Sequence, residues 1–169
     1  KGWTTEATVN KLKGPKGTFV KIGVRRKGFE RLLEMNVMRD QVSIPSLSAS
    51  FMIDDTTGYV GVTDFAEHTD EDLGLALAAL TKRGMKRLVL DMRNNPGGLL
   101  DASVDVSSLF LPRDKLVVYL QGRKKDDRKD CLATGDVQVR EYPVVVLVNT
   151  GSASASEIVA GALQDSKRA

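Results

Sequence analysis

The segment from residue 144 to residue 165 constrains the fold more than any other part of this chain of 169 residues. It opens with the aliphatic run Val144-Val-Val-Leu-Val148, turns at Asn149-Thr-Gly151, and then alternates serine with alanine up to Ser156. This order predicts a buried strand, a tight turn and a helix that begins at once. Such a turn leaves backbone N–H groups free at the helix N-terminus and can hold a serine hydroxyl there. It therefore suits a nucleophile beside an oxyanion site.

Helices and strands are predicted to alternate through the rest of the C-terminal two thirds of the chain. The predicted helices cover residues 69–83, about 99–110 and 154 onward, and the predicted strands cover residues 87–91, 115–120 and 144–148. Such alternation indicates an α/β fold with a largely parallel, buried sheet flanked by helices. The apolar runs Leu88-Val-Leu90 and 144–148 favour central positions in that sheet.

A hairpin is predicted at the entrance to this region. The turn Asp54-Asp-Thr-Thr-Gly58 separates an apolar stretch over 50–54 from another over 59–63, and Gly58 suits a positive φ. Upstream, residues 29–39 and 41–45 have the short apolar stretches of connecting strands. We place a domain boundary between residues 40 and 55, where Pro45 and several serines interrupt the pattern.

The N-terminal residues predict a helix followed by a strand. Thr4 or Thr5 can cap a helix over residues 4–13, and Gly14-Pro15 ends it. Ala7, Val9 and Leu12 can share an inward face of this helix. The strand is expected within residues 18–25.

Composition excludes several classes of function. The net charge is only +3, and the densest basic run, residues 123–129, is interrupted by acids and has no aromatic neighbours, which favours a solvated hairpin or loop over a nucleic-acid surface. The single cysteine, Cys131, excludes an internal disulfide and a cysteine metal cluster, and its polar setting argues against a reactive role. No apolar run is long enough to cross a bilayer, and no signal peptide is recognisable.

Two turns stand out as candidate sites, because sites in open α/β sheets collect beyond the carboxyl ends of strands. The first is Asp91-Met-Arg-Asn-Asn-Pro-Gly-Gly98, whose paired glycines let the backbone approach a ligand and point N–H groups into a concavity. It also fits a plain strand-to-helix turn, in which Asp91 and Arg93 form a structural ion pair. The second turn holds Ser152, Ser154 and Ser156, of which at least one is expected to cap the helix.

A nucleophilic serine needs a base, and the chain offers few. His68, the only histidine, lies in a predicted loop near a helix cap. Lys167 would lie about 16 Å along the axis of a helix that begins near Ser156, at a rise of 1.5 Å per residue. The remaining alternative is a lysine with a depressed pKa, desolvated in an apolar site.

Three segments in series resemble the carboxy-terminal processing proteases, also called tail-specific proteases, which are serine–lysine peptidases with a PDZ domain. They cover residues 53–59, 84–99 and 149–165, behind a PDZ-like end. The resemblance implies a serine endopeptidase without a cofactor or metal, with Ser154 as nucleophile and oxyanion donors at the N–H of Ala155 and of Gly97 or Gly98. The family's base is a lysine some two dozen residues beyond the serine, followed four positions later by a glutamine that orients it.

The resemblance also implies a domain plan and a cellular setting. Residues 1–27 would be the C-terminal part of a PDZ domain, with Val9 and Leu12 on its peptide-binding helix. Residues 28–50 would connect it to a catalytic core over 51–169. The substrates would be proteins or peptides with free C-termini, in an extracytoplasmic compartment, either periplasmic or secreted. The oligomeric state is left open. The chain begins at Lys1 without a methionine and ends at Ala169 before the expected lysine, so we expect an excised, inactive fragment.

Two other functions fit parts of the sequence. The chain could be a non-catalytic module that binds C-terminal peptides by strand addition, with the serine turn acting only as a helix cap. It could also bind acyl thioesters, although no acidic or histidine base stands beside Gly97-Gly98.

Overall fold

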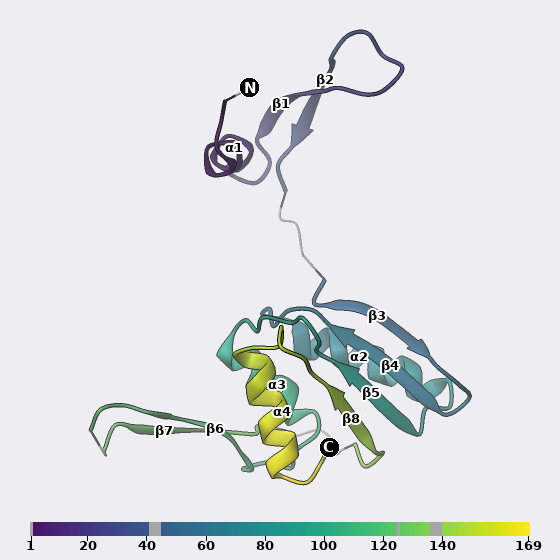
Figure 1. The fold of residues 1–169 in the computed structure, drawn as a ribbon, viewed down its shortest axis with the longest axis vertical. Helices are drawn as coiled ribbons and strands as arrows, with labels where there is room; N and C mark the ends of the chain where they lie inside the picture. The colour runs from purple at the N-terminus through teal and green to yellow at the C-terminus, as the bar shows by residue number, and fades with distance from the viewer. Residues whose placement is uncertain (1, 41–44, 125, 136–139) are drawn as a thin grey trace. The chain divides into compact units, whose positions relative to one another are not determined.

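The computed structural model describes residues 2–40, 45–124, 126–135 and 140–169. The chain divides into two compact units, Lys1–Ile44 and Pro45–Ala169, and the division falls within the predicted boundary region (Figure 1).

The first unit contains one helix and one antiparallel pair of strands. Helix α1 (Thr5–Leu12) is capped by the Thr4 hydroxyl, which accepts a hydrogen bond from the Ala7 N–H at 3.2 Å. Strands β1 (Phe19–Val24) and β2 (Leu33–Met38) pair along their full length. The prediction that Ala7, Val9 and Leu12 share an inward face of α1 is wrong, because no residue of that helix is buried.

The second unit is built on a four-stranded sheet. In spatial order its strands are β3 (Leu47–Met52), β4 (Thr57–Val62), β5 (Arg87–Asp91) and β8 (Val144–Leu147), as Figure 1 shows. Strands β3 and β4 form the predicted antiparallel hairpin, and β4, β5 and β8 run parallel. In the hairpin turn, Asp54 accepts hydrogen bonds from the N–H groups of Thr56 and Thr57, each at 2.8 Å.

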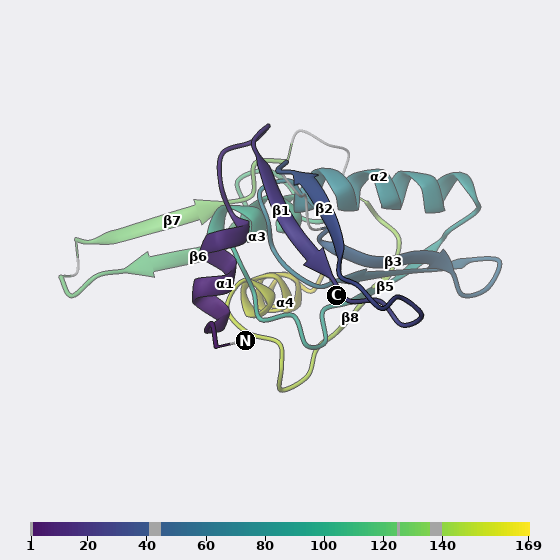
Figure 2. The ribbon, with the colours of Figure 1, turned by 90° about the horizontal axis from the view of Figure 1, so that it is seen from above.

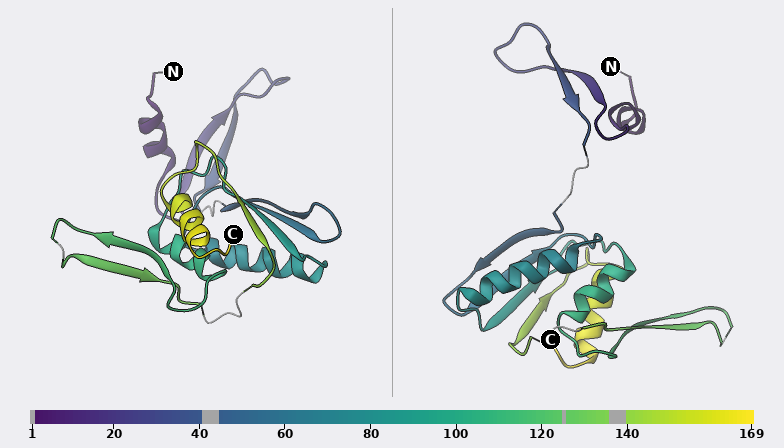
Figure 3. Two further views of the ribbon diagram at one scale, coloured as in Figure 1. Left: turned by 60° about the horizontal axis from the view of Figure 1, so that its bottom comes forward. Right: turned by 180° about the vertical axis from the view of Figure 1, so that it is seen from behind.

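Three helices complete the second unit: α2 (Thr69–Lys82), α3 (Leu100–Ser108) and α4 (Ala155–Asp165). Helix α2 lies across one face of the sheet (Figure 3, right), and α3 packs against α4. The core contains side chains from all three helices and from the sheet, including Val60, Leu77, Leu90, Val106 and Leu163. The second unit is therefore a mixed α/β structure with a partly parallel sheet.

Two expectations about the strands are wrong. Strand β6 (Leu116–Gln121) does not join the central sheet; it pairs with β7 (Arg128–Leu132) in a separate antiparallel hairpin that extends away from the sheet (Figure 2). The basic run predicted as a hairpin or loop lies at the end of this hairpin, with residue 125 outside the described residues. Within the described residues β8 is an edge strand rather than a central one, and Val145 is accordingly 56% exposed.

Candidate active site

Ser154 occupies the turn between β8 and α4 in an unusual backbone conformation. It is the N-cap of α4, with a φ of 53°, and its side chain is exposed. The Glu157 carboxylate accepts a hydrogen bond from the Ser154 N–H at 2.7 Å, which holds the turn to the first turn of the helix. A positive φ is strained for a residue other than glycine, and a serine on a strained strand-to-helix turn presents its hydroxyl outward. The Ser154 hydroxyl donates no hydrogen bond to the described residues, so it is available for chemistry.

The two flanking serines serve the structure instead. The Ser152 hydroxyl donates to the Met92 carbonyl at 2.7 Å, and the buried Ser156 hydroxyl donates to the Asn95 carbonyl at 3.0 Å. The capping position expected for at least one of the three serines falls on Ser154, because the helix begins at Ala155. Both flanking hydroxyls therefore tie the serine turn to the residues that follow β5.

Gly97 brings the two candidate turns into direct contact. Its φ is 105°, and a Cβ at this position would lie 2.7 Å from the Ser154 Cβ, 2.8 Å from the Ala153 oxygen and 2.9 Å from the Ala155 nitrogen. Only glycine permits so close an approach of one backbone to another. The ends of the adjacent parallel strands β5 and β8 thus converge on a single site.

The predicted oxyanion donors differ in their availability. The Ala155 N–H, first in the helix, donates no hydrogen bond to the residues that the structure describes, and the same holds for the Gly98 N–H. The Gly97 N–H donates to the buried Asn95 side-chain oxygen at 2.9 Å. Gly98 is exposed, and the Phe65 backbone borders it through a bridge between the two residues. The geometry thus favours Gly98 over Gly97 as the partner of Ala155.

Asn95 is a structural residue that the sequence did not single out. It is fully buried, and its side-chain amide donates to the Val62 carbonyl at 2.9 Å while its oxygen accepts the Gly97 N–H. Its backbone carbonyl accepts hydrogen bonds from the Ala153 N–H at 3.1 Å and from Ser156. An asparagine directly before Pro96-Gly97 was the available signal, since this residue type often bonds to backbone in turns.

Asp91 and Arg93 form the structural ion pair considered from the sequence. The Arg93 guanidinium contacts the Asp91 carboxylate at 2.6 Å, and the Tyr59 hydroxyl donates to the same carboxylate at 2.8 Å. The hydrogen bond from the Arg93 side chain lowers the pKa of Asp91 from 3.8 to about 2, and the bonds from the Arg93 N–H and from Tyr59 act in the same direction. The pKa of Tyr59 is raised by burial and by this carboxylate. Asp91 is therefore a fixed negative charge beneath the first turn, and its low pKa does not suit a general base at neutral pH.

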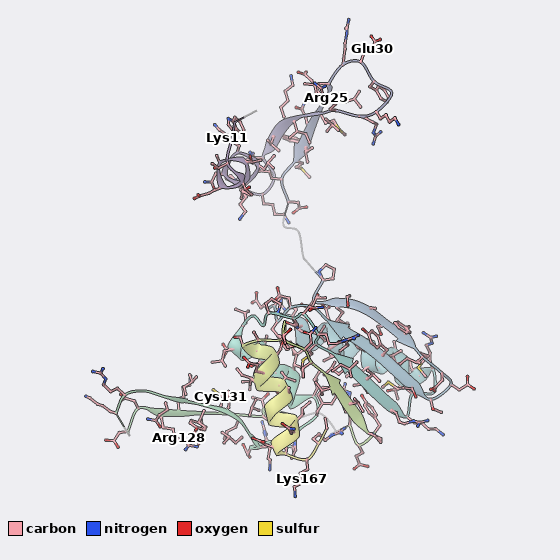
Figure 4. All side chains as sticks on the ribbon, viewed as in Figure 1. Lys11, Arg25, Glu30, Arg128, Cys131 and Lys167 are labelled. Atoms are coloured by element: carbon pink, nitrogen blue, oxygen red, sulfur yellow. The ribbon has the colours of Figure 1, made fainter. Side chains whose placement is uncertain are left out.

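Neither candidate base within the chain reaches the serine. His68 caps α2, is exposed, and pairs with Glu71 at 3.6 Å. Lys167 lies beyond the C-terminal end of α4 (Figure 4), and the 11 residues of that helix alone span about 16 Å at a rise of 1.5 Å per residue. In the part of the chain that the structure describes, no hydrogen bond joins Ser154 to a lysine or a histidine.

The two residues predicted on the peptide-binding helix, Val9 and Leu12, lie in the first unit. Leu12 lines an apolar groove of about 460 Å³ together with residues of β1 and β2, whereas Val9 does not line it. No cluster of histidine, cysteine and acidic side chains suited to a metal ion occurs among the described residues. No helix in the described ranges is long and apolar enough to cross a membrane.

Comparison with known proteins gives one consistent family. The model of Peptidase family S41 matches residues 56–169. The chain is 38% identical to the carboxy-terminal-processing protease of Bartonella bacilliformis, with 99% of this chain and 39% of that protein aligned. It is 34% identical to the carboxy-terminal processing protease CtpA of Bacillus subtilis, with 98% and 35% aligned. The solved structure of a photosystem II D1 C-terminal processing protease matches with a TM-score of 0.63 and 30% identity, over 98% of this chain and 46% of that one. The chain thus spans about two fifths or less of the length of these two curated relatives.

Proposed function

Because the chain belongs to peptidase family S41, we propose that it forms part of a serine endopeptidase that cuts protein substrates near their C-termini, with Ser154 as the nucleophile. One observation carries this assignment. Of the three serines in the turn, only Ser154 combines an exposed side chain and a strained φ of 53° with a hydroxyl that donates no hydrogen bond within the described residues. The hydroxyls of Ser152 and Ser156 are already engaged with backbone carbonyls.

The oxyanion site in this proposal consists of the N–H groups of Ala155 and Gly98. Donors that are fixed by the fold stabilise the negative charge of a tetrahedral intermediate without having to reorganise during the reaction. The positive end of the α4 dipole lies at Ala155 and acts in the same direction. Gly97 contributes the close approach of the two turns rather than a donor, since its own N–H is bonded to Asn95.

The general base in this mechanism is a lysine that the protein supplies from outside residues 1–169. Its neutral amine would take the proton from Ser154 Oγ while the oxygen attacks the peptide carbonyl carbon. The protonated amine would then give that proton to the leaving nitrogen as the peptide bond breaks, and water would hydrolyse the acyl-enzyme through the same groups. A lysine can be neutral near pH 7 when burial in an apolar site lowers its pKa. Without that lysine, residues 1–169 alone would show no proteolysis.

The organisation around the catalytic core is part of the same proposal. Residues 1–27 would be the C-terminal part of a PDZ domain and residues 51–169 the catalytic core. Residues 28–50 would connect them, although β2 within this interval pairs with β1 in the first unit. The position of Leu12 on the apolar groove of the first unit supports a role in peptide binding, whereas Val9 has no such support. We also propose an extracytoplasmic location, which fractionation of the native cells with an antibody would test.

The decisive experiment uses the full-length protein and an unstructured substrate with a free C-terminus. Ser154→Ala should lower the cleavage rate by several orders of magnitude, as loss of a nucleophile does. Ser152→Ala and Ser156→Ala are the matched controls and should keep most of the activity. A metal chelator should leave the rate unchanged. Full turnover by Ser154→Ala would refute the assignment, and activity in all three variants would favour a module that only binds peptides.

A further inference from the structure

A pair of asparagine side chains joins the two turns of the site at the surface. Asn94 follows β5 and Asn149 follows β8, and the two line a polar pocket of about 320 Å³ beside the Asp91–Arg93 ion pair. The Asn149 side-chain amide donates to the Asn94 side-chain oxygen at 3.0 Å, and the Asn149 side-chain oxygen accepts the Asn94 N–H at 2.8 Å. These two bonds run in opposite directions between the same residues and so fix both the spacing and the orientation of the turns.

The same oxygen also organises the serine turn itself. Asn149 Oδ1 accepts a second hydrogen bond, from the Gly151 N–H at 3.0 Å, and the Asn149 N–H donates to the Ser152 hydroxyl at 3.0 Å. Asn94 has a φ of 60°, a conformation that asparagine tolerates better than most residues. At Gly151, a Cβ would lie 2.9 Å from the Asn94 side-chain oxygen. The side chain of Asn149 therefore connects the backbone of the glycine turn (residues 91–98) to the backbone of the serine turn (residues 149–156).

We propose that Asn94 and Asn149 are positioning residues, which set the placement of the oxyanion donor Gly98 relative to Ser154 without touching the reacting atoms. This inference rests on the function proposed above. The carbonyl of the buried Asn95 accepts hydrogen bonds from the Ser156 hydroxyl and the Ala153 N–H, and these bonds already hold the two turns together from the core side. The asparagine pair is exposed, so water replaces its hydrogen bonds when they are lost, and the cost to global stability is small. Catalysis is more sensitive than stability, because a misplacement of about 1 Å costs roughly a hundredfold in rate.

The test compares three variants of the full-length protease. Asn149→Ala removes every bond that the Asn149 side chain makes and should lower kcat by about 10- to 100-fold. Asn94→Gly keeps the backbone donor and relieves the positive φ, so it removes only the bond to the Asn149 amide, and kcat should fall by about fivefold. The double variant should be no slower than Asn149→Ala alone, since both changes act on one contact. In all three, KM should change by less than about twofold.

The control is Gln121→Ala, which removes another exposed side-chain amide that bonds to the backbone. In the parent, Gln121 Nε2 donates a hydrogen bond to the Lys124 carbonyl oxygen at 2.8 Å. It lies on the β6–β7 hairpin and should leave kcat unchanged. A thermal melt of each variant separates a folding defect from misplacement, and melting temperatures close to that of the parent are expected. The inference would be overturned by an unchanged kcat in Asn149→Ala. It would also be overturned if the loss of kcat in the asparagine variants were matched by a loss of thermal stability, or if the effects of the two single changes on kcat added independently in the double variant. Ser154→Ala, run alongside, tests the proposed function separately: if it stays active, the nucleophile assignment fails, whatever the asparagine variants do.

Discussion

Gly97→Ala tests whether the close contact between the two turns is a requirement of the fold. The backbone of Gly97 has a φ of 105°, which alanine rarely adopts, and strain of this kind costs about 1 to 3 kcal/mol. The added methyl would also meet the Ala153 oxygen at 2.8 Å and the Ala155 nitrogen at 2.9 Å, which are backbone atoms that cannot rotate away. Overpacking of this kind costs a further 1 to 3 kcal/mol or so. The free energy of unfolding should therefore fall by about 2 to 6 kcal/mol.

Urea unfolding followed by far-ultraviolet circular dichroism would measure this loss. The method reports on helix content, and α2, α3 and α4 all belong to the second unit, which contains Gly97. Gly161→Ala is the matched control: Gly161 lies inside α4, a Cβ there meets nothing within 4 Å, and alanine should stabilise that helix by about 0.5 to 1 kcal/mol. If the free energy of unfolding of Gly97→Ala lay within about 1 kcal/mol of that of the parent, the two turns could move apart at little cost in stability. The argument that glycine is required for their contact would then be wrong.

Two further predictions concern the charges and hydroxyls around the site. The pKa of Asp91 is held at about 2, below its ordinary 3.8, so its ionised form stabilises the fold above about pH 4 and this contribution is lost as the pH falls toward 2. Asp91→Asn should therefore be less stable than the parent at neutral pH, and denaturant titrations should show the difference shrinking in acid; a constant difference would exclude the linkage. Ser156→Ala should cost about 1 kcal/mol, because the Asn95 carbonyl keeps its bond from Ala153, whereas Ser152→Ala should cost about 1 to 2 kcal/mol, because the Asn149 N–H loses its acceptor. Equal stability of both variants and the parent would show that these hydroxyls are not structural.

The local elements of the second unit could be predicted because their signals are short-range. The hairpin around Asp54 follows from turn residues between apolar stretches, and α2 and α4 follow from apolar periodicity after small or acidic residues. The place of β6 could not be predicted in the same way. Its run Leu116-Val-Val-Tyr-Leu120 is as apolar as a strand of the central sheet. Its partner β7 follows a charged turn and has the mostly polar sequence Arg128-Lys-Asp-Cys-Leu132, which does not indicate a strand.

The candidate site could be predicted at the level of its turns but not of its contacts. The glycine pair and the serine turn were visible, because each follows an apolar strand. The engagement of the Gly97 N–H with Asn95 was not visible, since it depends on a tertiary placement that also leads the Asn95 amide to Val62. Likewise, Asn94 and Asn149 are far apart in the sequence and become neighbours only because β5 and β8 pair in parallel.

The backbone conformation of Ser154 limits which residues can replace it during evolution. Threonine has the same hydroxyl chemistry, but its Cβ is branched, and a β-branched residue rarely adopts a φ of 53°. Cysteine is unbranched and meets no such obstacle. A lineage could therefore exchange the oxygen at this turn for sulfur more easily than it could add one methyl group. At this position the shape of the turn, more than the reactivity of the group, decides which side chains are admitted.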